Sequence, residues 1–391
     1  MAMTVIAFIL AFLQGLALVP VLGGSVFSVL CVAAAWRLRR QHRHPLAPFA
    51  PPVSVLKPVY GIDRELEANL RSFCCQDYPD YEVIFSLQRH DDPARPILEA
   101  LAREYPDRVK LAIEDSPPAL NGKVQNMLIG YRAAAHALLV ISDSDTRVPA
   151  DYLRRIIAPL ADDRVGYVCT LYRIVRPRNL AEALELLTIN ADFVPSILFT
   201  DWTKVAVFCL GASIALRRDD LEAIGGLAPL AEYLVEDQEM GRRLIAQGKT
   251  MRLLPLTVDM LPDYARLRDW WRHVVYWDQN TKAAHKPGFA ATVLIRAVPF
   301  AGIFWLATGF APGGLAVFAA AVAVRLITAA GIALLLGDRA SLRHLWLLPL
   351  RDVLGLASWA AALAKRRFVW RGHEFGLSPE GRIIPRTGAE G

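Results

Sequence analysis

The sequence predicts an α/β domain with a largely parallel sheet, flanked by N-terminal and C-terminal transmembrane helices. Three observations lead to this prediction. Strand-like apolar runs alternate with helical patterns between Val53 and about Tyr264, an order typical of parallel sheets. The chain is 54% hydrophobic, with a mean hydropathy of +0.29, and its long apolar stretches lie at the two ends. Acidic residues follow several of the expected strands, where open α/β sheets place their ligands.

The strands of the α/β domain are expected where short apolar runs are flanked by polar residues. These runs are Val53–Leu56, Val83–Leu87, Val109–Ile113, Leu138–Ile141 and Val165–Leu171. Helical patterns lie between them, at Arg64–Cys75, Ala94–Glu104, Val124–Ala137 and Ala150–Leu160. A stretch of about 210 residues is enough for one sizeable core, and we assign residues 53–288 to this domain.

The first 36 residues predict a transmembrane segment. Met1–Trp36 contains no charged residue and is longer than the roughly 20 apolar residues that a spanning helix needs. It lacks a basic start and a small-residue cleavage site, so we do not expect a removable signal peptide. A basic, Pro-rich linker at residues 37–52 follows, and the positive-inside rule places it and the α/β domain in the cytoplasm. We expect an integral protein of a bacterial inner membrane.

Residues 289–364 form a second membrane region. Three apolar segments qualify by length, at about 290–311, 314–336 and 345–364. The basic tail, residues 365–391, should also be cytoplasmic, so an even number of crossings must separate it from the α/β domain. We therefore expect two crossings and one interfacial or re-entrant segment. We choose 345–364 for the latter, because Arg351 and Asp352 lie near its middle.

Net charge and cysteine content limit the kinds of partner and of metal or disulfide site that we expect. A net charge of +6 and a pI near 9.1 fit a protein that lies on anionic lipid in the bilayer. No aromatic-basic binding motif accompanies the basic residues, so we expect no nucleic-acid partner. The five cysteines are odd in number and include no C-x-x-C pair. This pattern argues against a zinc site or a disulfide framework and favours reduced thiols.

Three acidic clusters stand at expected loop positions of the α/β domain. They are His90-Asp91-Asp92-Pro93, Asp143-Ser144-Asp145 and Glu236-Asp237. Carboxylates at i and i+2 can share a hard divalent cation together with substrate phosphates. The alternative is structural: Asp143 and Asp145 could form a polar turn, Asp92 an N-cap, and Asp237 a first-turn residue that complements the helix dipole.

These clusters belong to a longer ordered series of motifs. The series is VSVLKPVYGIDRELEANLRSFCCQDYPDYE, HDDPA, NGKVQN, ISDSDTRV, CLGASIALRRDDLEAIGGL, VEDQEMGRRL and, near the end, FVWRGHEFGL. With this series the chain resembles the family 2 glycosyltransferases of the GT-A fold, and most of all their ceramide glucosyltransferase-like branch. That branch also includes hopanoid-type lipid glycosyltransferases. A D-x-D pair alone is a weak signal, whereas the ordered series is specific and covers nearly the whole chain.

The resemblance implies a nucleotide-binding role for four residues. Asp91 or Asp92 would contact the uridine of a UDP-sugar, and we favour Asp92. Lys57 and Lys123, in the KP and N-G-K motifs, would lie near the nucleotide. The alternative for each lysine is a solvated surface side chain.

The resemblance also implies the catalytic residues. Asp143 and Asp145 would hold Mg²⁺ or Mn²⁺ on the diphosphate, with Asp145 the favoured direct ligand. Asp237 would be the general base that deprotonates the acceptor hydroxyl, while Glu236 would point elsewhere. Gly211 would let the backbone approach the donor sugar, unless it is a plain turn glycine.

One motif departs from the family pattern. The family places Q/R-x-x-R-W before its C-terminal membrane region, and here His273 and Trp277 fit the ends of that motif. Tyr276 stands where arginine is expected, which puts donor geometry in doubt. Arg272 or Lys282 are the candidate substitutes. A tryptophan-rich stretch of this kind also suits the aromatic belt of a membrane interface.

The function implied is a membrane-bound inverting glycosyltransferase that moves a sugar from a UDP-sugar to a membrane lipid hydroxyl, with ceramide as the favoured acceptor. A hopanoid lipid N-acetylglucosaminyltransferase is one alternative. A processive polysaccharide synthase would need more crossings and a complete Q-x-x-R-W motif. A non-catalytic membrane scaffold would have no reason to keep three acidic clusters in order. The sequence leaves the sugar open among glucose, N-acetylglucosamine, galactose and glucuronic acid.

Overall fold

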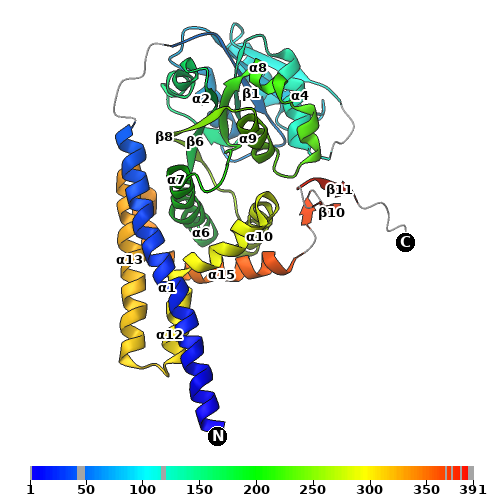
Figure 1. Cartoon of the computed structure of the whole chain (residues 1–391). Helices are drawn as coiled ribbons and strands as arrows, with labels where there is room; N and C mark the ends of the chain where they lie inside the picture. Colours follow the sequence, from blue (N-terminus) through cyan, green and yellow to red (C-terminus); the bar gives the residue numbers. More distant parts are fainter. Residues whose placement is uncertain are drawn as a thin grey trace, which may run out of the picture. The chain divides into compact units, whose positions relative to one another are not determined.

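The computed structural model describes residues 2–41, 49–115, 120–365, 368–370, 373–378 and 381–385. Within them the chain forms two compact units, each assembled from three stretches (Figure 1). The helical unit comprises Met1–Arg40, Arg176–Thr203 and Tyr264–Phe368. The α/β unit comprises Gln41–Val175, Lys204–Asp263 and Val369–Gly391. The range 53–288 therefore contains parts of both units, because packing between distant stretches leaves no mark in the local sequence.

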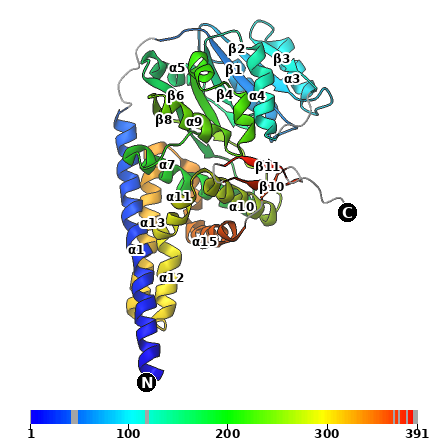
Figure 2. The same ribbon diagram turned by 45° about the vertical axis from the view of Figure 1, so that its right-hand side comes forward.

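Eight strands of the described residues form one mixed sheet, in the order β3-β2-β1-β4-β7-β6-β8-β5 (Figure 2). They are β1 Val53–Pro58, β2 Tyr81–Leu87, β3 Val109–Ile113, β4 Leu138–Ser142, β5 Thr146–Arg147, β6 Val165–Ile174, β7 Ser213–Arg217 and β8 Thr250–Met260. Strands β1 to β4 pair in parallel, as do β6 and β8. Strand β7 runs antiparallel to both of its neighbours, and β5 runs antiparallel to β8. The predicted strands are confirmed, whereas β5, β7 and β8 were not anticipated.

Short helices connect these strands. They are α2 Leu66–Cys74, α3 Arg95–Glu104, α4 Gly122–Ala133, α5 Tyr152–Ile157, η1 Ala158–Ala161, α8 Arg218–Ala223, η3 Ala228–Glu232 and α9 Glu236–Ala246. Helix α4 begins earlier than the expected Val124, because the Asn121 side chain accepts hydrogen bonds from the backbone N–H groups of Lys123 and Val124. Such an N-cap satisfies donors that the first turn leaves without a partner.

The register of the parallel strands fixes where the functional loops meet. Val53 of β1 lies opposite Tyr81 of β2 and opposite Leu138 of β4. The carboxyl ends of β1, β2 and β4 therefore share one edge of the sheet. Since ligands of open α/β sheets bind outside this edge, the loops that follow these strands are the place to look for a site.

The C-terminal stretch adds a small second sheet to the described residues. It contains β9 Phe368–Trp370, β10 His373–Leu377 and β11 Ile383–Pro385, in the order β11-β10-β9. Strands β10 and β11 pair antiparallel. Arg371 and Gly372 of the expected closing motif lie outside the described residues.

The helical unit is built from one long N-terminal helix and two later groups. Its helices are α1 Ala2–Gln41, α6 Leu180–Thr188, the π-helix η2 Ile189–Phe193, α7 Val194–Thr203, α10 Leu267–Ala284, α11 Lys286–Ala291, η4 Thr292–Ile295, α12 Ala297–Ala307, α13 Pro312–Leu336, α14 Arg339–His344, η5 Leu345–Leu347 and α15 Leu348–Ala364. The π-helix interrupts an otherwise continuous helical stretch between α6 and α7.

Four helical stretches of the described residues are long and apolar enough to cross a membrane. They are Gln14–Gln41, Leu180–Thr203, Pro312–Leu336 and Arg339–Ala364. A fifth crossing results if Lys286–Ile295 and Ala297–Ala307, which meet at a bend of 53°, form one broken span. The expected continuous segment 290–311 is thus interrupted. Leu180–Thr203, with a hydropathy of 1.3, was not among the expected segments. It lies between β6 and β7, which pair in one sheet, so a single crossing there would separate paired strands. That 345–364 is interfacial or re-entrant stays a prediction.

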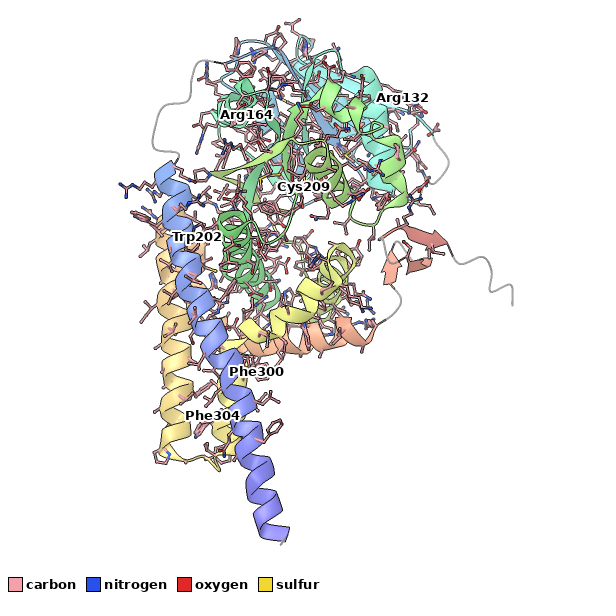
Figure 3. The ribbon with its side chains drawn as sticks, in the orientation of Figure 1. Arg132, Arg164, Trp202, Cys209, Phe300 and Phe304 are labelled. Carbon is pink, nitrogen blue, oxygen red and sulfur yellow. The ribbon has the colours of Figure 1, made fainter. Side chains whose placement is uncertain are left out.

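Small residues let α1 pack closely against the broken helix pair. A Cβ atom at Gly23 would lie 2.6 Å from the carbonyl oxygen of Leu294, so only glycine fits this contact. Val21 and Ala301 belong to one buried apolar cluster, against which Phe300 packs (Figure 3). Close backbone approach through small residues is a usual way for membrane helices to associate.

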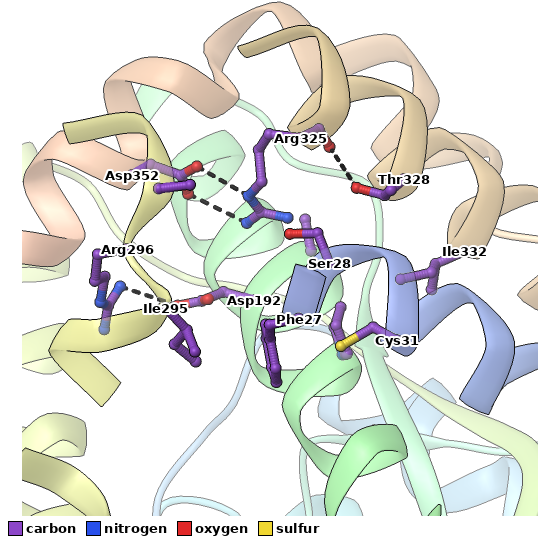
Figure 4. A pocket seen from close by; sticks show the side chains of 13 residues that line it. Phe27, Ser28, Cys31, Asp192, Ile295, Arg296, Arg325, Thr328, Ile332 and Asp352 are labelled. Carbon is purple, nitrogen blue, oxygen red and sulfur yellow. Dashed lines mark hydrogen bonds and ion pairs between the residues drawn. The ribbon is translucent and has the colours of Figure 1, made fainter. Parts of the chain in front are cut away.

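A network of buried and half-buried charges joins several helices of this unit (Figure 4). Nη1 of Arg351 lies 2.6 Å from Oδ2 of Asp192, and Nη1 of Arg296 lies 3.4 Å from the same oxygen. Arg325 pairs with Asp352 at 2.9 Å. Arg351 and Asp352 are 3.6 Å apart, so the expected ion pair is one contact of a larger network. Because each buried charge needs a partner, this network fixes how η2, α13 and α15 pack.

Replacement of Asp192 tests this role. Asp192→Asn would leave the guanidinium groups of Arg351 and Arg296 buried without their shared carboxylate, at a cost of about 3 kcal/mol. We expect a lower thermal unfolding midpoint in detergent, followed by tryptophan fluorescence. Asp269→Asn, a half-buried carboxylate on α10, is the control. Equal midpoints for the two variants would show that the network does not stabilise the unit.

Candidate active site

The loop after β4 carries the D-x-D pair to the carboxyl edge of the sheet. The backbone N–H of Asp143 donates to the carbonyl of Ala212 at 3.3 Å, and the hydroxyl of Ser142 donates to the same carbonyl at 2.9 Å. These bonds tie the end of β4 to the residues before β7, which include Gly211. Two segments about 70 residues apart in sequence are thereby held together.

A cavity of about 250 Å³ opens beside this loop. Its lining residues come from the loops after β1 and β4 and from the start of α4. They are Pro58, Tyr60, Asp63, Gly122, Lys123, Asn126, Asp143, Ser144 and Asp145. Three carboxylates and one ammonium group therefore surround a space at the edge of the sheet where ligands are expected.

The two D-x-D carboxylates differ in their surroundings. Oδ1 of Asp143 lies 2.7 Å from Nζ of Lys123, so its charge is paired. Burial, reinforced by the negative charges of Asp143 and Asp63, raises the pKa of Asp145 to about 7. Its Oδ1 atom is buried and finds no hydrogen-bond partner among the described residues. Asp145 thus holds an acceptor atom that a cation could satisfy.

Lys57 lies beneath the D-x-D loop and does not line the cavity. It is fully buried, and its Nζ donates to the Asp143 carbonyl and, at 3.0 Å, to the hydroxyl of Thr146. The ring centroid of Phe73 lies 3.8 Å from the same atom. Burial lowers the pKa of Lys57 to about 7, although the carboxylates of Asp143 and Asp145 oppose that shift. Lys57 therefore fixes the backbone of the D-x-D loop through its bond to the Asp143 carbonyl.

Lys123 stands between two groups of carboxylates. Its Nζ lies 2.7 Å from Oδ1 of Asp143 and 3.3 Å from Oε1 of Glu236. Burial works against its charge, but the carboxylates of Asp143, Glu236 and Asp237 outweigh it and hold the pKa of Lys123 well above its usual value. Lys123 also lines a second, small cavity that includes Gly211 and Asp237. It therefore links the D-x-D loop to the E-D motif.

Asp237 lies in the first turn of α9, and two backbone N–H groups bind its carboxylate. Its Oδ2 accepts from Gly211 at 2.6 Å, and its Oδ1 accepts from Gln238 at 2.7 Å. Burial and the neighbouring charge of Glu236 raise the pKa of Asp237 to about 7, against the opposing effect of Lys123. A carboxylate with a pKa near the working pH is well suited to general base catalysis.

A glycine is needed at position 211 so that the backbone there can lie close to the Asp237 carboxylate. A Cβ atom at this position would lie 2.5 Å from Oδ2 of Asp237 and 3.2 Å from Nζ of Lys123. The expectation that Gly211 admits a donor sugar stays untested, but its backbone already contacts the candidate base.

Asp91 and Asp92 do not line the cavity. Asp92 accepts hydrogen bonds from the backbone N–H of Gly61, at 3.1 Å, and of Ala94, at 2.8 Å. It thereby anchors the loop after β1, which contains Tyr60, to the start of α3. Asp91 is exposed and forms an ion pair with Arg89. A direct uridine contact for either residue stays a prediction.

The residues of the altered Q/R-x-x-R-W motif lie in the helical unit, on α10. The ring of Trp277 packs against Phe193 and His273, both at 5.6 Å between centroids, and Arg272 is exposed. Lys282, considered as a substitute for the missing arginine, instead donates to the carbonyls of Ala362 and other residues at the end of α15. Cations at this position satisfy the last carbonyls of a helix.

Three residues of the site were missed or misjudged in the sequence. Asp63 lines the cavity and accepts from the hydroxyl of Ser144 at 2.6 Å, and burial raises its pKa. Its position after the first strand was the available signal. Glu236 points toward Lys123, and Asn121 donates to both Glu236 and the Tyr233 carbonyl at 3.0 Å. No local pattern indicated these long-range bonds.

The residues present fit a divalent cation shared with a diphosphate. No group of three or more His, Cys, Asp or Glu residues suited to a metal occurs in the part of the chain that the structure describes. Mg²⁺, however, is usually held by one or two carboxylates, with phosphates and water completing its coordination. Asp143 and Asp145 supply two carboxylates beside the cavity, and Oδ1 of Asp145 is an acceptor still to be satisfied.

The chain is similar to known lipid glycosyltransferases. It is 28% identical over 212 residues to ceramide glucosyltransferase 1 of Caenorhabditis elegans, which is 54% of this chain and 45% of that protein. It is 35% identical over 121 residues to the ceramide glucosyltransferase of Komagataella phaffii, covering 30% of this chain and 24% of that protein. The matches thus span less than half the length of these curated relatives.

A solved structure and a family model extend the comparison over most of the chain. The mannosyltransferase PcManGT of Pyrobaculum calidifontis, in complex with GDP-Man and Mn²⁺, has a TM-score of 0.54 at 20% identity. The match covers 90% of this chain and 99% of that one and confirms the expected GT-A fold. A family model described as glycosyl transferase family 21 matches residues 16–383. The chain belongs to glycosyl transferase family 21.

Proposed function

We propose that this protein is a membrane-bound inverting glycosyltransferase that moves a sugar from a UDP-sugar to a hydroxyl of a ceramide-like lipid. One observation carries the proposal: Lys123 lies within 2.7 Å of Asp143 of the D-x-D pair and within 3.3 Å of Glu236, beside Asp237. The candidate diphosphate-binding residues and the candidate base therefore stand on either side of one ammonium group. Such juxtaposition is what a transfer between two bound substrates requires.

The residues then divide the reaction as follows. Asp237 takes the proton of the lipid hydroxyl while the hydroxyl oxygen attacks the anomeric carbon and the bond from that carbon to UDP breaks. A single displacement converts an α-linked donor into a β-glycoside. Asp143 and Asp145 would hold Mg²⁺ or Mn²⁺, which when bound offsets the negative charge on the departing UDP. The nearby ammonium of Lys123 fixes the position of the D-x-D loop relative to the base.

Membrane attachment explains how a two-tailed acceptor is supplied. The helical unit contains four stretches that are long and apolar enough to cross a bilayer, counted within the described residues. Arg37, Arg39 and Arg40 at the end of the first stretch favour a cytoplasmic α/β unit. The acceptor can then be taken from the bilayer without first entering water.

The names of the relatives support ceramide as the acceptor and glucose as the first sugar to test. A hopanoid acceptor is the rival with the same chemistry. Mass spectrometry of lipids from cells with and without this protein separates the two, because the added mass names the sugar and the remainder names the lipid. A polymer product would favour a synthase, and no new product would favour a scaffold.

Removal of the base should abolish transfer. We expect Asp237→Asn to lower the rate of lipid glycosylation about a thousandfold, the contribution usual for a general base, while UDP-sugar binding is retained. Asp219→Asn is the control, because Asp219 occupies the corresponding second position of α8 and is exposed. Purified Asp237→Asn protein that glycosylates lipid at the wild-type rate would refute the proposed base.

Metal removal gives a separate test of the D-x-D pair. We expect a chelator to stop UDP release and added Mg²⁺ or Mn²⁺ to restore it. Asp145→Asn should raise the metal concentration required for activity at least about tenfold, since one of two carboxylate ligands is lost. Equal metal dependence of this variant and the wild type would exclude Asp145 as a ligand.

The Gly211→Ala substitution, which adds one methyl group, tests whether the close contact between residue 211 and Asp237 is needed for activity. We expect Gly211→Ala to reduce turnover at least about tenfold, because its Cβ would overlap the position of the Asp237 carboxylate. Gly313→Ala is the control, since its Cβ would meet no atom within 4 Å. A fully active Gly211→Ala variant would show that the Asp237 carboxylate moves away from Gly211 during catalysis.

A further inference from the structure

The loop that leads into the candidate base lacks a helix cap of its own. Helix α9 begins at Glu236, and the residue at its N-cap position is Val235, whose side chain has no oxygen to bind the first N–H groups. Caps of this kind usually hold the first turn of a helix in place. Since Asp237 lies in that turn, its position depends on what holds residues 232–235, in addition to its own bonds with Gly211 and Gln238.

On one side this loop is bound by Asn121. The Asn121 side chain donates to the carbonyl of Tyr233 and to Oε2 of Glu236, both at 3.0 Å. Its Oδ1 also caps α4, the helix that carries Lys123. The inner contact of the loop is therefore part of the site already described.

Further contacts of the loop come from the C-terminal segment of the α/β unit, which includes β11 (Figure 2). The N–H of Leu234 donates to the carbonyl of Gly381 at 3.3 Å, and Tyr233 forms an antiparallel bridge with Arg382. Nη1 of Arg382 lies 2.7 Å from Oε2 of Glu232. Its guanidinium also lies 5.4 Å from the centroid of the Tyr233 ring.

Two residues of this segment, Ser378 and Arg382, are hydrogen-bonded to each other. The N–H of Arg382 donates to the hydroxyl of Ser378 at 3.2 Å, and the N–H of Ser378 donates to the carbonyl of Arg382 at 3.0 Å. Ile383, the first residue of β11, is buried. A braced segment can restrain the loop that it contacts.

We propose that the described residues of the C-terminal segment, Ser378 and residues 381–385, form a clamp that positions the loop before Asp237, and that Arg382 is its positioning residue. Arg382 joins Glu232 and Tyr233 at once, through an ion pair and a cation–ring contact. Arg243 of α9 lies 5.6 Å from the same ring, so the Tyr233 side chain connects the clamp to the helix of the base. This inference rests on the proposed role of Asp237 as the base.

A loosened loop should affect turnover more than donor binding. The cavity lined by Asp143 and Asp145 includes no residue of this loop. Small displacements of a catalytic group can cost large factors in rate. We therefore expect Arg382→Ala to lower kcat on the order of tenfold and to leave the KM for the donor within about twofold. Arg382→Lys, which keeps the charge, should recover most of the lost rate.

The experiment uses the full chain in detergent with short-chain ceramide, Mg²⁺ and UDP-glucose, at a temperature well below the unfolding midpoint of each variant. Arg154→Ala is the matched control, because Arg154 is similarly exposed (50%, against 54% for Arg382) and pairs with Asp77 at 3.0 Å on the same unit. A selective kcat loss in Arg382→Ala, with recovery in Arg382→Lys and no loss in Arg154→Ala, supports the clamp.

Three results would overturn it. Arg382→Ala could keep kcat within about twofold of the wild type, or Arg154→Ala could lose as much activity as Arg382→Ala. A fully active Asp237→Asn, assayed in parallel, would instead remove the base on which the clamp acts. An inactive Asp237→Asn beside an unaffected Arg382→Ala would refute the clamp alone and leave the proposed function standing.

Discussion

The charge of Lys123 is the interaction on which the rest of the site depends. Asp143 follows β4, and Glu236 and Asp237 begin α9 about 90 residues later. Their like charges would repel one another if brought together alone. The half-buried ammonium gives them a shared partner, and the carboxylates in turn keep that ammonium charged. One balance of charges thus sets the geometry of the candidate diphosphate-binding residues and of the candidate base. Gly211 is a second condition, because any larger residue would occupy the space of the Asp237 carboxylate.

Part of this arrangement could be predicted from the sequence. The strands β1 to β4 have short apolar cores with polar flanks, and the acidic clusters after β2 and β4 fall where the parallel register brings strand ends together. The GT-A fold and the resemblance to the ceramide glucosyltransferase-like branch were confirmed by the comparisons. Strand β7 was missed because it is a short strand within a motif read for its glycine. Leu180–Thr203 was missed because its modest hydropathy is that of a buried helix.

The motif residues do not all line the described cavity. Lys57 and Asp92 were expected near the nucleotide, which stays a prediction, and the bonds described for them go to backbone groups and hydroxyls of neighbouring loops. Spacing in a sequence cannot distinguish a side chain that contacts a ligand from one that shapes the loop contacting it. Asp63, in contrast, lines the cavity and was overlooked because a single carboxylate in a loop is unremarkable. The same limit applied to Asn121, whose side-chain amide donates to groups more than 100 residues away.

The bridge between Tyr233 and Arg382 has a consequence for the order of events during synthesis. The α/β unit is interrupted twice by stretches of the helical unit, and its last contacts come from residues beyond α15. A ribosome therefore finishes the described helices through α15 before Arg382, a partner of the loop before Asp237, exists. The α/β unit can form these contacts only after those helices have been made. A nascent chain that stalls earlier would hold the candidate catalytic carboxylates in a unit that still lacks this contact.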